Sequence, residues 1–178
     1  RSYARSINDH GTILGWSTEA NTGINRSWTY SRSGGLVWIT SPPGNDNVPS
    51  FRINNAGQST LWVSPNTTSP GRAFVAQPDG SLVEYNISGF PGGLVTEVSD
   101  AGVAVGYNFT WVGGGYAWDW NALVWPSPNA PYQAFPTWYG VANFLDRFNS
   151  INFEGLAVGT MINGNGTGVI YDTTNGGI

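Results

Sequence analysis

The sequence predicts an all-β fold: a β-propeller, or a propeller-like array, of about four four-stranded antiparallel blades, with the last blade incomplete. Three observations predict it. One turn motif occurs four times at nearly regular spacing, and a short apolar run with strand composition follows each copy. Gly and Pro also interrupt the chain too often for a helix of useful length.

Each turn motif has a β-branched residue, then a small polar residue, and a glycine four positions after the first. Asn, Ser and Asp favour a bend, and glycine accepts the positive φ that closes a tight hairpin. The four copies are Ile7-Asn8-Asp9-His10-Gly11, Ile53-Asn54-Asn55-Ala56-Gly57, Val98-Ser99-Asp100-Ala101-Gly102 and Ile151-Asn152-Phe153-Glu154-Gly155.

The strands expected after each turn complete a meander. The second strand is expected at 12–16, 59–63, 103–107 and 156–160, and the third at 27–30, 72–75, 116–119 and 168–171. A second turn occurs in three copies, at Gly34-Gly35, Asp79-Gly80 and Asn175-Gly176. It leads to a fourth strand at 36–39 and at 81–85 in the first two copies.

The motif glycines are 46, 45 and 53 residues apart, close to the range of roughly 40–50 residues per propeller blade. We therefore expect a single repeat domain over residues 1–178, with units at approximately 3–48, 49–94, 95–147 and 148–178. The longer third interval is interpreted as a decorated loop from Trp125 to Arg147.

The repeat resembles the HAF-type extracellular repeat family. The matching residues are Ala4 with the first turn motif, Val105-Gly106-Tyr107, Ala73-Phe74, Ala117-Trp118 and Gly34-Gly35. The second unit departs from the pattern with Leu61 in place of glycine, and the fourth with Thr160 in place of the aromatic residue. The resemblance implies a secreted or cell-surface location, a propeller-like fold and no enzymatic activity.

The fourth unit stops 23 residues after Gly155, where its outermost strand would begin. We expect one of three arrangements: a blade of three strands, a strand donated by a partner chain, or further blades beyond this segment. An open sheet edge is a template for pairing with a neighbour. Assembly with copies of itself or with other surface proteins is therefore expected.

The composition of the chain disfavours some classes of partner and of chemistry. Only 10% of residues are charged. The chain has no Lys, seven Arg and eleven acidic residues, which gives a net charge of −4. A nucleic-acid partner is disfavoured because phosphate neutralisation needs a basic stripe. The chain has no Cys, which removes thiolate chemistry, and no run of about 18 apolar residues, so no membrane span is expected.

Five Asn-x-Ser/Thr sequons are candidate glycosylation sites. Four of them fall at or near the connection between second and third strands, and one falls between the fourth strand of the second unit and the first strand of the third. We hypothesise that one rim of the propeller carries glycans, the alternative being ordinary polar surface loops. The sites are Asn25, Asn66, Asn86, Asn108 and Asn165.

Catalytic signals are weak. The single His10 lies in a turn without a second His or a Cys, so neither a metal site nor a Ser-His-Asp triad is expected. Asp9 and Asp100 occupy the same motif position and are interpreted as turn caps. Paired carboxylates could hydrolyse glycosides. The spacing of Glu97, Asp119, Asp146 and Glu154 does not select such a pair. We expect no enzyme, no cofactor and no metal.

Aromatic residues outside the repeat register are the candidate contacts for a ligand or partner, because exposed Trp and Tyr rings stack on sugars. These residues are Trp111, Trp120, Trp125, Trp138 and Tyr139. Aromatic residues within the register are expected to pack between blades.

Three functions remain. The first is a non-catalytic extracellular structural or surface-assembly glycoprotein, self-associating through its open sheet edge. The alternative is a carbohydrate-binding lectin that uses the exposed Trp and Tyr residues. A glycoside-active propeller enzyme comes third.

Overall fold

A computed structural model describes residues 1–41, 50–61, 73–85, 87, 92–112, 117–135, 144–162 and 167–175. For residues 92, 109–112, 117–120, 144–146, 161–162 and 167 it describes the backbone alone. No helix in these ranges is long and apolar enough to cross a membrane.

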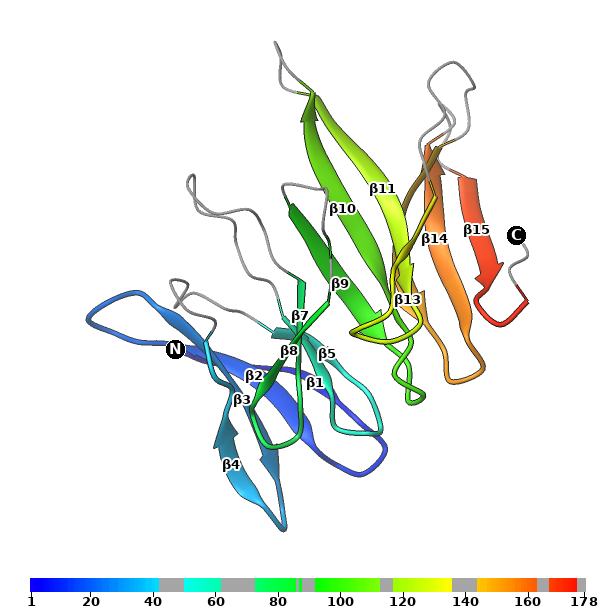
Figure 1. The fold of residues 1–178 in the computed structure, drawn as a ribbon. Helices are drawn as coiled ribbons and strands as arrows, with labels where there is room; N and C mark the ends of the chain where they lie inside the picture. The colour runs from blue at the N-terminus through cyan, green and yellow to red at the C-terminus, as the bar shows by residue number, and fades with distance from the viewer. Residues whose placement is uncertain are drawn as a thin grey trace.

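The described residues form antiparallel strands in four sheets that follow chain order (Figure 1). The strands are β1 (Ser2–Ile7), β2 (Ile13–Thr18), β3 (Asn25–Ser31) and β4 (Gly35–Trp38) in the first sheet; β5 (Ser50–Ile53), β6 (Ser59–Leu61), β7 (Ala73–Ala76) and β8 (Leu82–Tyr85) in the second; β9 (Gly92–Val98), β10 (Ala104–Val112), β11 (Ala117–Trp125) and β12 (Gln133–Phe135) in the third; and β13 (Phe144–Ile151), β14 (Leu156–Ile162) and β15 (Thr167–Asp172) in the fourth.

Each sheet is a meander in which consecutive strands are hydrogen-bonded neighbours. The sheets stand side by side, with the first and fourth at the two ends of the array (Figure 1). The fourth sheet has three described strands where the others have four. The expected fold class, a propeller-like array of about four antiparallel blades with an incomplete last one, is confirmed.

The four motif glycines are equivalent turns. Gly11, Gly57, Gly102 and Gly155 have φ of 76°, 80°, 83° and 86°, a region that residues with a Cβ rarely adopt. Each donates its N–H to the carbonyl of the residue three positions earlier, at 2.9–3.2 Å. The repeat predicted from these turns is therefore present in the fold.

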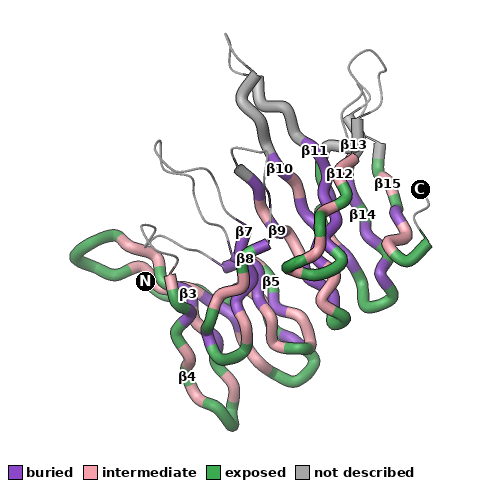
Figure 2. The backbone as a smooth tube through the Cα atoms, viewed as in Figure 1, coloured by how far each residue is buried: buried purple, intermediate pink, exposed green. Residues whose placement is uncertain are grey.

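Three hydrophobic cores lie between neighbouring sheets, one at each junction. The side chains of a strand alternate between its two faces, so an interior sheet contributes to two cores. Leu14 belongs to the core between the first and second sheets, Trp125 to the next, and Phe148 to the last. Figure 2 shows this burial along the facing strands and exposure at the turns.

The first strand of each sheet carries a β-bulge against the second strand. We call these four strands, β1, β5, β9 and β13, the inner strands. In the first, third and fourth sheets a glycine of the second strand lies beside the bulge. A Cβ on Gly15, Gly106 or Gly159 would overlap the carbonyl oxygen of Tyr3, Leu94 or Arg147, respectively. Close backbone approach, and not a positive φ, explains these glycines.

Two boundaries differ from expectation. The third and fourth sheets begin at Gly92 and Phe144, earlier than the expected unit bounds of 95 and 148. The third strand of the third unit was expected at 116–119 but β11 continues to Trp125, so the expected loop begins only after that residue. A fourth strand, β12, then lies within that segment and pairs with β11.

Candidate functional site

Hydrogen bonds join the turn motifs of the first three sheets in a row that we call the turn ladder. It consists of the residues at motif positions two and three: Asn8, Asp9, Asn54, Asn55, Ser99 and Asp100. Two kinds of bond repeat from one sheet to the next.

At motif position two, an asparagine amide donates to the backbone carbonyl of the next turn. Asn8 Nδ2 donates to Asn54 O at 2.9 Å, and Asn54 Nδ2 donates to Ser99 O at 3.0 Å. At position three, a backbone N–H donates to the side chain of the next turn. The N–H of Asp9 bonds Asn55 Oδ1 at 3.0 Å, and that of Asn55 bonds Asp100 Oδ1 at 2.7 Å.

This arrangement corrects the interpretation of Asp9 and Asp100 as turn caps. The cap is the residue at position two, since Asn8 Oδ1 accepts the N–H groups of His10 and Thr12 at 3.1 and 2.9 Å. The position-three carboxylates instead bond Asn55 of the second sheet: Asp9 Oδ2 accepts its amide at 2.9 Å, and Asp100 accepts its N–H. The motif therefore closes a turn and also ties neighbouring sheets together.

The ladder stops at the fourth sheet. Ser99 has no amide to donate forward, and Phe153 offers no side-chain acceptor at position three. The junction between the third and fourth sheets is held instead by a carboxylate on the inner strands.

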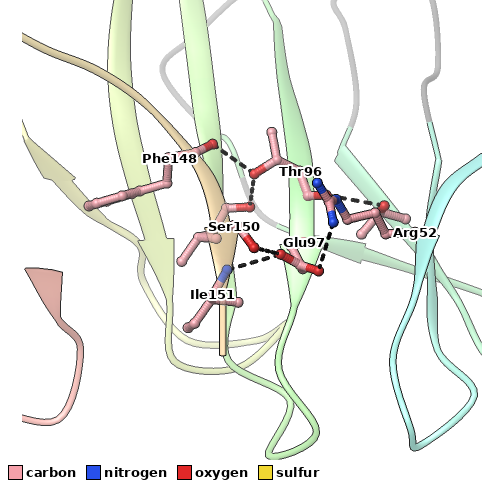
Figure 3. A network of polar contacts seen from close by, with 8 residues as sticks. Arg52, Thr96, Glu97, Phe148, Ser150 and Ile151 are labelled. Carbon is pink, nitrogen blue, oxygen red and sulfur yellow. Dashed lines mark hydrogen bonds and ion pairs between the residues drawn. The ribbon is translucent and has the colours of Figure 1, made fainter. Parts of the chain in front are cut away.

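That carboxylate belongs to Glu97 of β9 (Figure 3). Its Oε2 accepts the hydroxyl of Ser150 and, at 3.0 Å, the N–H of Ile151, both on β13. Its Oε1 lies 3.7 Å from Nη1 of Arg52 on β5. One side chain thus contacts the inner strands of both neighbouring sheets.

Thr96 supports the same junction. Its hydroxyl lies 2.8 Å from Phe148 O and 3.0 Å from Val105 O, and its carbonyl accepts the hydroxyl of Thr60 at 3.3 Å. These contacts position strands. In the described part of the chain no group of three or more His, Cys, Asp and Glu residues is arranged to hold a metal ion.

The outer face of the first sheet is apolar and exposed. Ile7, Ile13, Tyr30 and Leu36 are successive cross-strand partners and therefore share this face. Ile7 is 64% exposed, whereas its equivalents Ile53, Val98 and Ile151 are 8%, 3% and 6% exposed.

Tyr30 shows the same contrast. It is 45% exposed, whereas its equivalents Ala76, Trp125 and Tyr171 are at most 2% exposed. Leu36 and Trp38 of β4 are each 51% exposed. At the positions of Ile7 and Tyr30 the first sheet therefore presents side chains that, in the other sheets, are covered by the preceding sheet. The position of Trp38 differs, because its equivalent in the second sheet, Glu84, is exposed as well.

The outer face of the fourth sheet is the counterpart. Val158 and Ile170 are cross-strand partners and are 43% and 63% exposed. Leu14, Thr60 and Val105, which occupy the position of Val158 in the other sheets, are fully buried by the sheet that follows. The array thus ends on both sides in an exposed apolar face, which we call the first-sheet face and the fourth-sheet face.

The sequons fall in different surroundings. Asn25 is half-buried at the start of β3, at the opposite end of its sheet from Gly11, and its Oδ1 accepts the hydroxyl of Thr18 at 2.8 Å. Asn108 was expected in a connection but lies within β10, fully buried, with Oδ1 accepting the amide of Asn121 at 2.9 Å. This burial argues against a glycan at Asn108. Asn66, Asn86 and Asn165 lie outside the described residues.

Trp125 is not a free contact residue, which corrects the expectation that it lies outside the repeat. It pairs with Ala104 as Tyr171 pairs with Ala157, and it is fully buried between the second and third sheets. Its ring packs edge-on to Tyr85, at 5.9 Å between centroids. Burial raises the pKa of the Tyr85 hydroxyl to about 12.

The other predicted contact residues are placed only in part. Trp111 and Trp120 lie on β10 and β11, in cross-strand register with Trp118 and Phe109, but their side chains are not described. Trp138 and Tyr139 lie outside the described residues. Among the described residues, the exposed aromatic side chains that the sequence did not predict as contacts are Tyr3, Tyr30, Trp38 and Phe153. Tyr30 follows the ordinary apolar pattern of a buried strand, and its place on an end sheet exposes it, whereas Trp38 lies at a position that is also exposed in the second sheet, at Glu84.

No protein-family model matches this chain, and no curated protein matches it. Among solved structures, the chain is similar to one described as a streptogramin B lyase, with 14% sequence identity and a TM-score of 0.48. The match covers 98% of this chain and 55% of the other, so this chain spans about half the length of that structure.

Proposed function

We propose that this chain is a non-catalytic structural protein of an extracellular surface, which assembles with its own copies or with other surface proteins. The observation that carries the proposal is the pair of exposed apolar faces at the ends of the array. The exposed fraction is between 43% and 64% for each of the five side chains Ile7, Tyr30, Leu36, Val158 and Ile170. Contiguous exposed apolar side chains mark interaction surfaces in soluble proteins.

Burying these side chains is favourable. Each fully buried large apolar side chain contributes about 1.5–3 kcal/mol relative to exposure. The extracellular location is supported by the resemblance to the HAF-type repeats, and a glycan at Asn25 is consistent with the position of that residue at the end of its sheet away from the turn ladder. The free edge of β15 offers a second route for pairing, since β14 is its one neighbour among the described strands.

Light scattering across a range of concentrations, followed by negative-stain microscopy, tests the proposal. We expect association that grows with concentration, and regular assemblies in the images. A monodisperse monomer throughout, with no partner recovered from the surface of the source cell, would contradict it.

Carbohydrate binding is the second candidate, favoured by the exposed Trp38. Trp38 lies opposite Trp28 across β3 and β4, and Tyr30 shares their face. Aromatic faces of this kind stack on the apolar faces of sugars. A glycan array distinguishes the two functions, because a monomer that binds defined sugars, and loses binding in Trp38→Ala, supports the lectin.

A further inference from the structure

The two end faces are complementary to each other, and not each to itself. In the interior of the array, the face equivalent to the fourth-sheet face always packs on the face equivalent to the first-sheet face. Leu14 of the first sheet, for example, shares a core with Ile53 and Ala76 of the second. This relation repeats at three junctions, so it is an interface that the fold already uses.

The hydrogen bonds between turn motifs run in one direction, from donors of the earlier turn to acceptors of the later one. A junction of the ladder needs an amide at position two of the earlier turn and a side-chain oxygen at position three of the later one. The fourth turn supplies the donors, because Asn152 carries an amide and the Phe153 N–H donates to no other described residue. Asn152 Nδ2 makes only a long contact of 3.5 Å, to Glu154 Oε2.

The first turn supplies the acceptors. Asn8 O accepts the N–H of Gly11 at 3.0 Å, as Asn54 O accepts that of Gly57 at 3.1 Å. Asn54 O accepts an amide from the preceding sheet as well, so the geometry of the turn leaves room for a second bond at Asn8 O. Asp9 has a carboxylate at the position where Asn55 and Asp100 accept an N–H from the preceding sheet.

We propose that the fourth-sheet face of one copy of this chain packs on the first-sheet face of a second copy, head to tail. In this junction Asn152 Nδ2 donates to Asn8 O of the second copy, and the Phe153 N–H donates to the Asp9 carboxylate of the second copy. Val158 and Ile170 cover Ile7, Tyr30 and Leu36 across the interface. The proposal rests on the proposed function and identifies the partner and the orientation of its assembly.

Two variants test the orientation, each with charges placed on one face only. The first-sheet variant is Tyr30→Lys with Leu36→Lys, and the fourth-sheet variant is Val158→Lys with Ile170→Lys. All four positions are at least 43% exposed, so the fold of the monomer should tolerate them. Ser127→Lys with Asn129→Lys, at exposed turn residues that follow β11 of the third sheet, is the matched control for added charge.

We expect the wild type and the control to associate in sedimentation experiments, and each face variant alone to remain monomeric. Mixed in equal amounts, the two variants should form a complex of two chains, because the intact fourth-sheet face of one meets the intact first-sheet face of the other. Far-ultraviolet circular dichroism before mixing verifies that both variants are folded.

The outcomes separate the two proposals. If the fourth-sheet variant still self-associates, the first-sheet face pairs with its own copy, and the head-to-tail orientation is wrong. If both variants assemble as the wild type does, another surface is used: the inference fails while the proposed function stands. If the wild type is monomeric at every concentration, both fail.

A conservative variant tests the hydrogen bond. Asn152→Asp retains the Oδ1 atom that accepts the N–H groups of Glu154 and Leu156 at 3.0 and 2.8 Å, and removes the amide. We expect association to weaken by more than the roughly two- to tenfold that one lost hydrogen bond gives, because the new carboxylate faces the carbonyl oxygen of Asn8, with unchanged thermal unfolding of the monomer. Unchanged association would remove Asn152 from the interface.

Discussion

The side-chain amide of Asn55, in the second sheet, donates to the carboxylate of Asp9, in the first, with Nδ2 2.9 Å from Oδ2. The two residues are 46 positions apart in the chain. Asp9 returns a bond through its backbone N–H, to Asn55 Oδ1. The pair ties the first blade to the second at a position that turn chemistry alone does not explain.

A double-mutant cycle of Asp9→Ala and Asn55→Ala measures this tie. We expect a coupling free energy of about 0.5–1 kcal/mol, because the pair is solvent-exposed and hydrogen bonds of this kind contribute about 1 kcal/mol net. Urea denaturation of the four proteins gives the value, with His10→Ala as the control within the same turn. Additive effects would show that the two side chains stabilise only their own turns.

The glycine beside each bulge gives a second prediction. Gly106→Ala forces a Cβ against the carbonyl oxygen of Leu94, which belongs to the backbone and cannot move aside cheaply. We expect a loss of about 2–4 kcal/mol of unfolding free energy, at or above the usual cost of overpacking. Gly168→Ala is the matched control, because a Cβ there meets no atom within 4 Å and φ is not positive. Equal effects of the two changes would contradict the close-approach explanation.

Glu97 and Arg52 form an ion pair but should contribute unequally. The Glu97 side chain is 19% exposed and also accepts bonds from Ser150 and Ile151, whereas that of Arg52 is 55% exposed. We expect Glu97→Ala to cost about 2–3 kcal/mol and Arg52→Ala less than about 1 kcal/mol. Thermal unfolding at low and high salt checks this, since only the Arg52 contribution should fall with salt. A larger effect of Arg52→Ala would contradict the assignment.

The buried hydroxyl of Tyr85 should lower the free energy of unfolding at alkaline pH. Burial raises the pKa of its hydroxyl to about 12 from an unfolded value of 10, so the folded state holds the proton more tightly. The resulting stabilisation is complete below pH 10 and is lost as the pH rises through 12. Tyr85→Phe should flatten the fall in unfolding free energy between pH 10 and 12, measured by urea denaturation. An unchanged slope would show that other tyrosines cause it.

The architecture was predictable because its signal is local. A glycine with positive φ, preceded by Asn or Ser, is a requirement of a single turn, and four such turns reveal the repeat without any long-range information. Leu61 shows the limit: the second unit lacks the glycine that the other three place beside their bulges, and sequence alone could not say what that glycine was for.

The contacts of the candidate site could not be predicted, because they join residues of neighbouring sheets and the sequence does not show which residues of two sheets meet. Asp9 reads as a turn cap until the next sheet places Asn55 beside it. The sequence gives no sign that Glu97 joins two sheets, because its partner Ser150 lies on β13, 53 residues away in the chain. Trp125 was misplaced because Pro and Asn residues follow it closely, which concealed that β11 extends to it. Tyr30 follows the pattern of a core strand and is exposed because its sheet is first in the array, since its equivalents in the other sheets are buried.

The ladder also makes the chain modular. The first and second turns donate through a side-chain amide and a backbone N–H, and the second and third accept through a backbone carbonyl and a side-chain oxygen. Excision of the whole second unit would therefore place Asn8 opposite Ser99 and Asp9 opposite Asp100. The Asn8 amide and the Asp9 N–H would again face acceptors, but the Asp9 carboxylate would lose the Asn55 amide and would lie near a second carboxylate. A gene encoding such a protein could gain single interior repeats without redesigning the seams between them, provided that each new blade carries Asn at the second and third motif positions, as the second unit does.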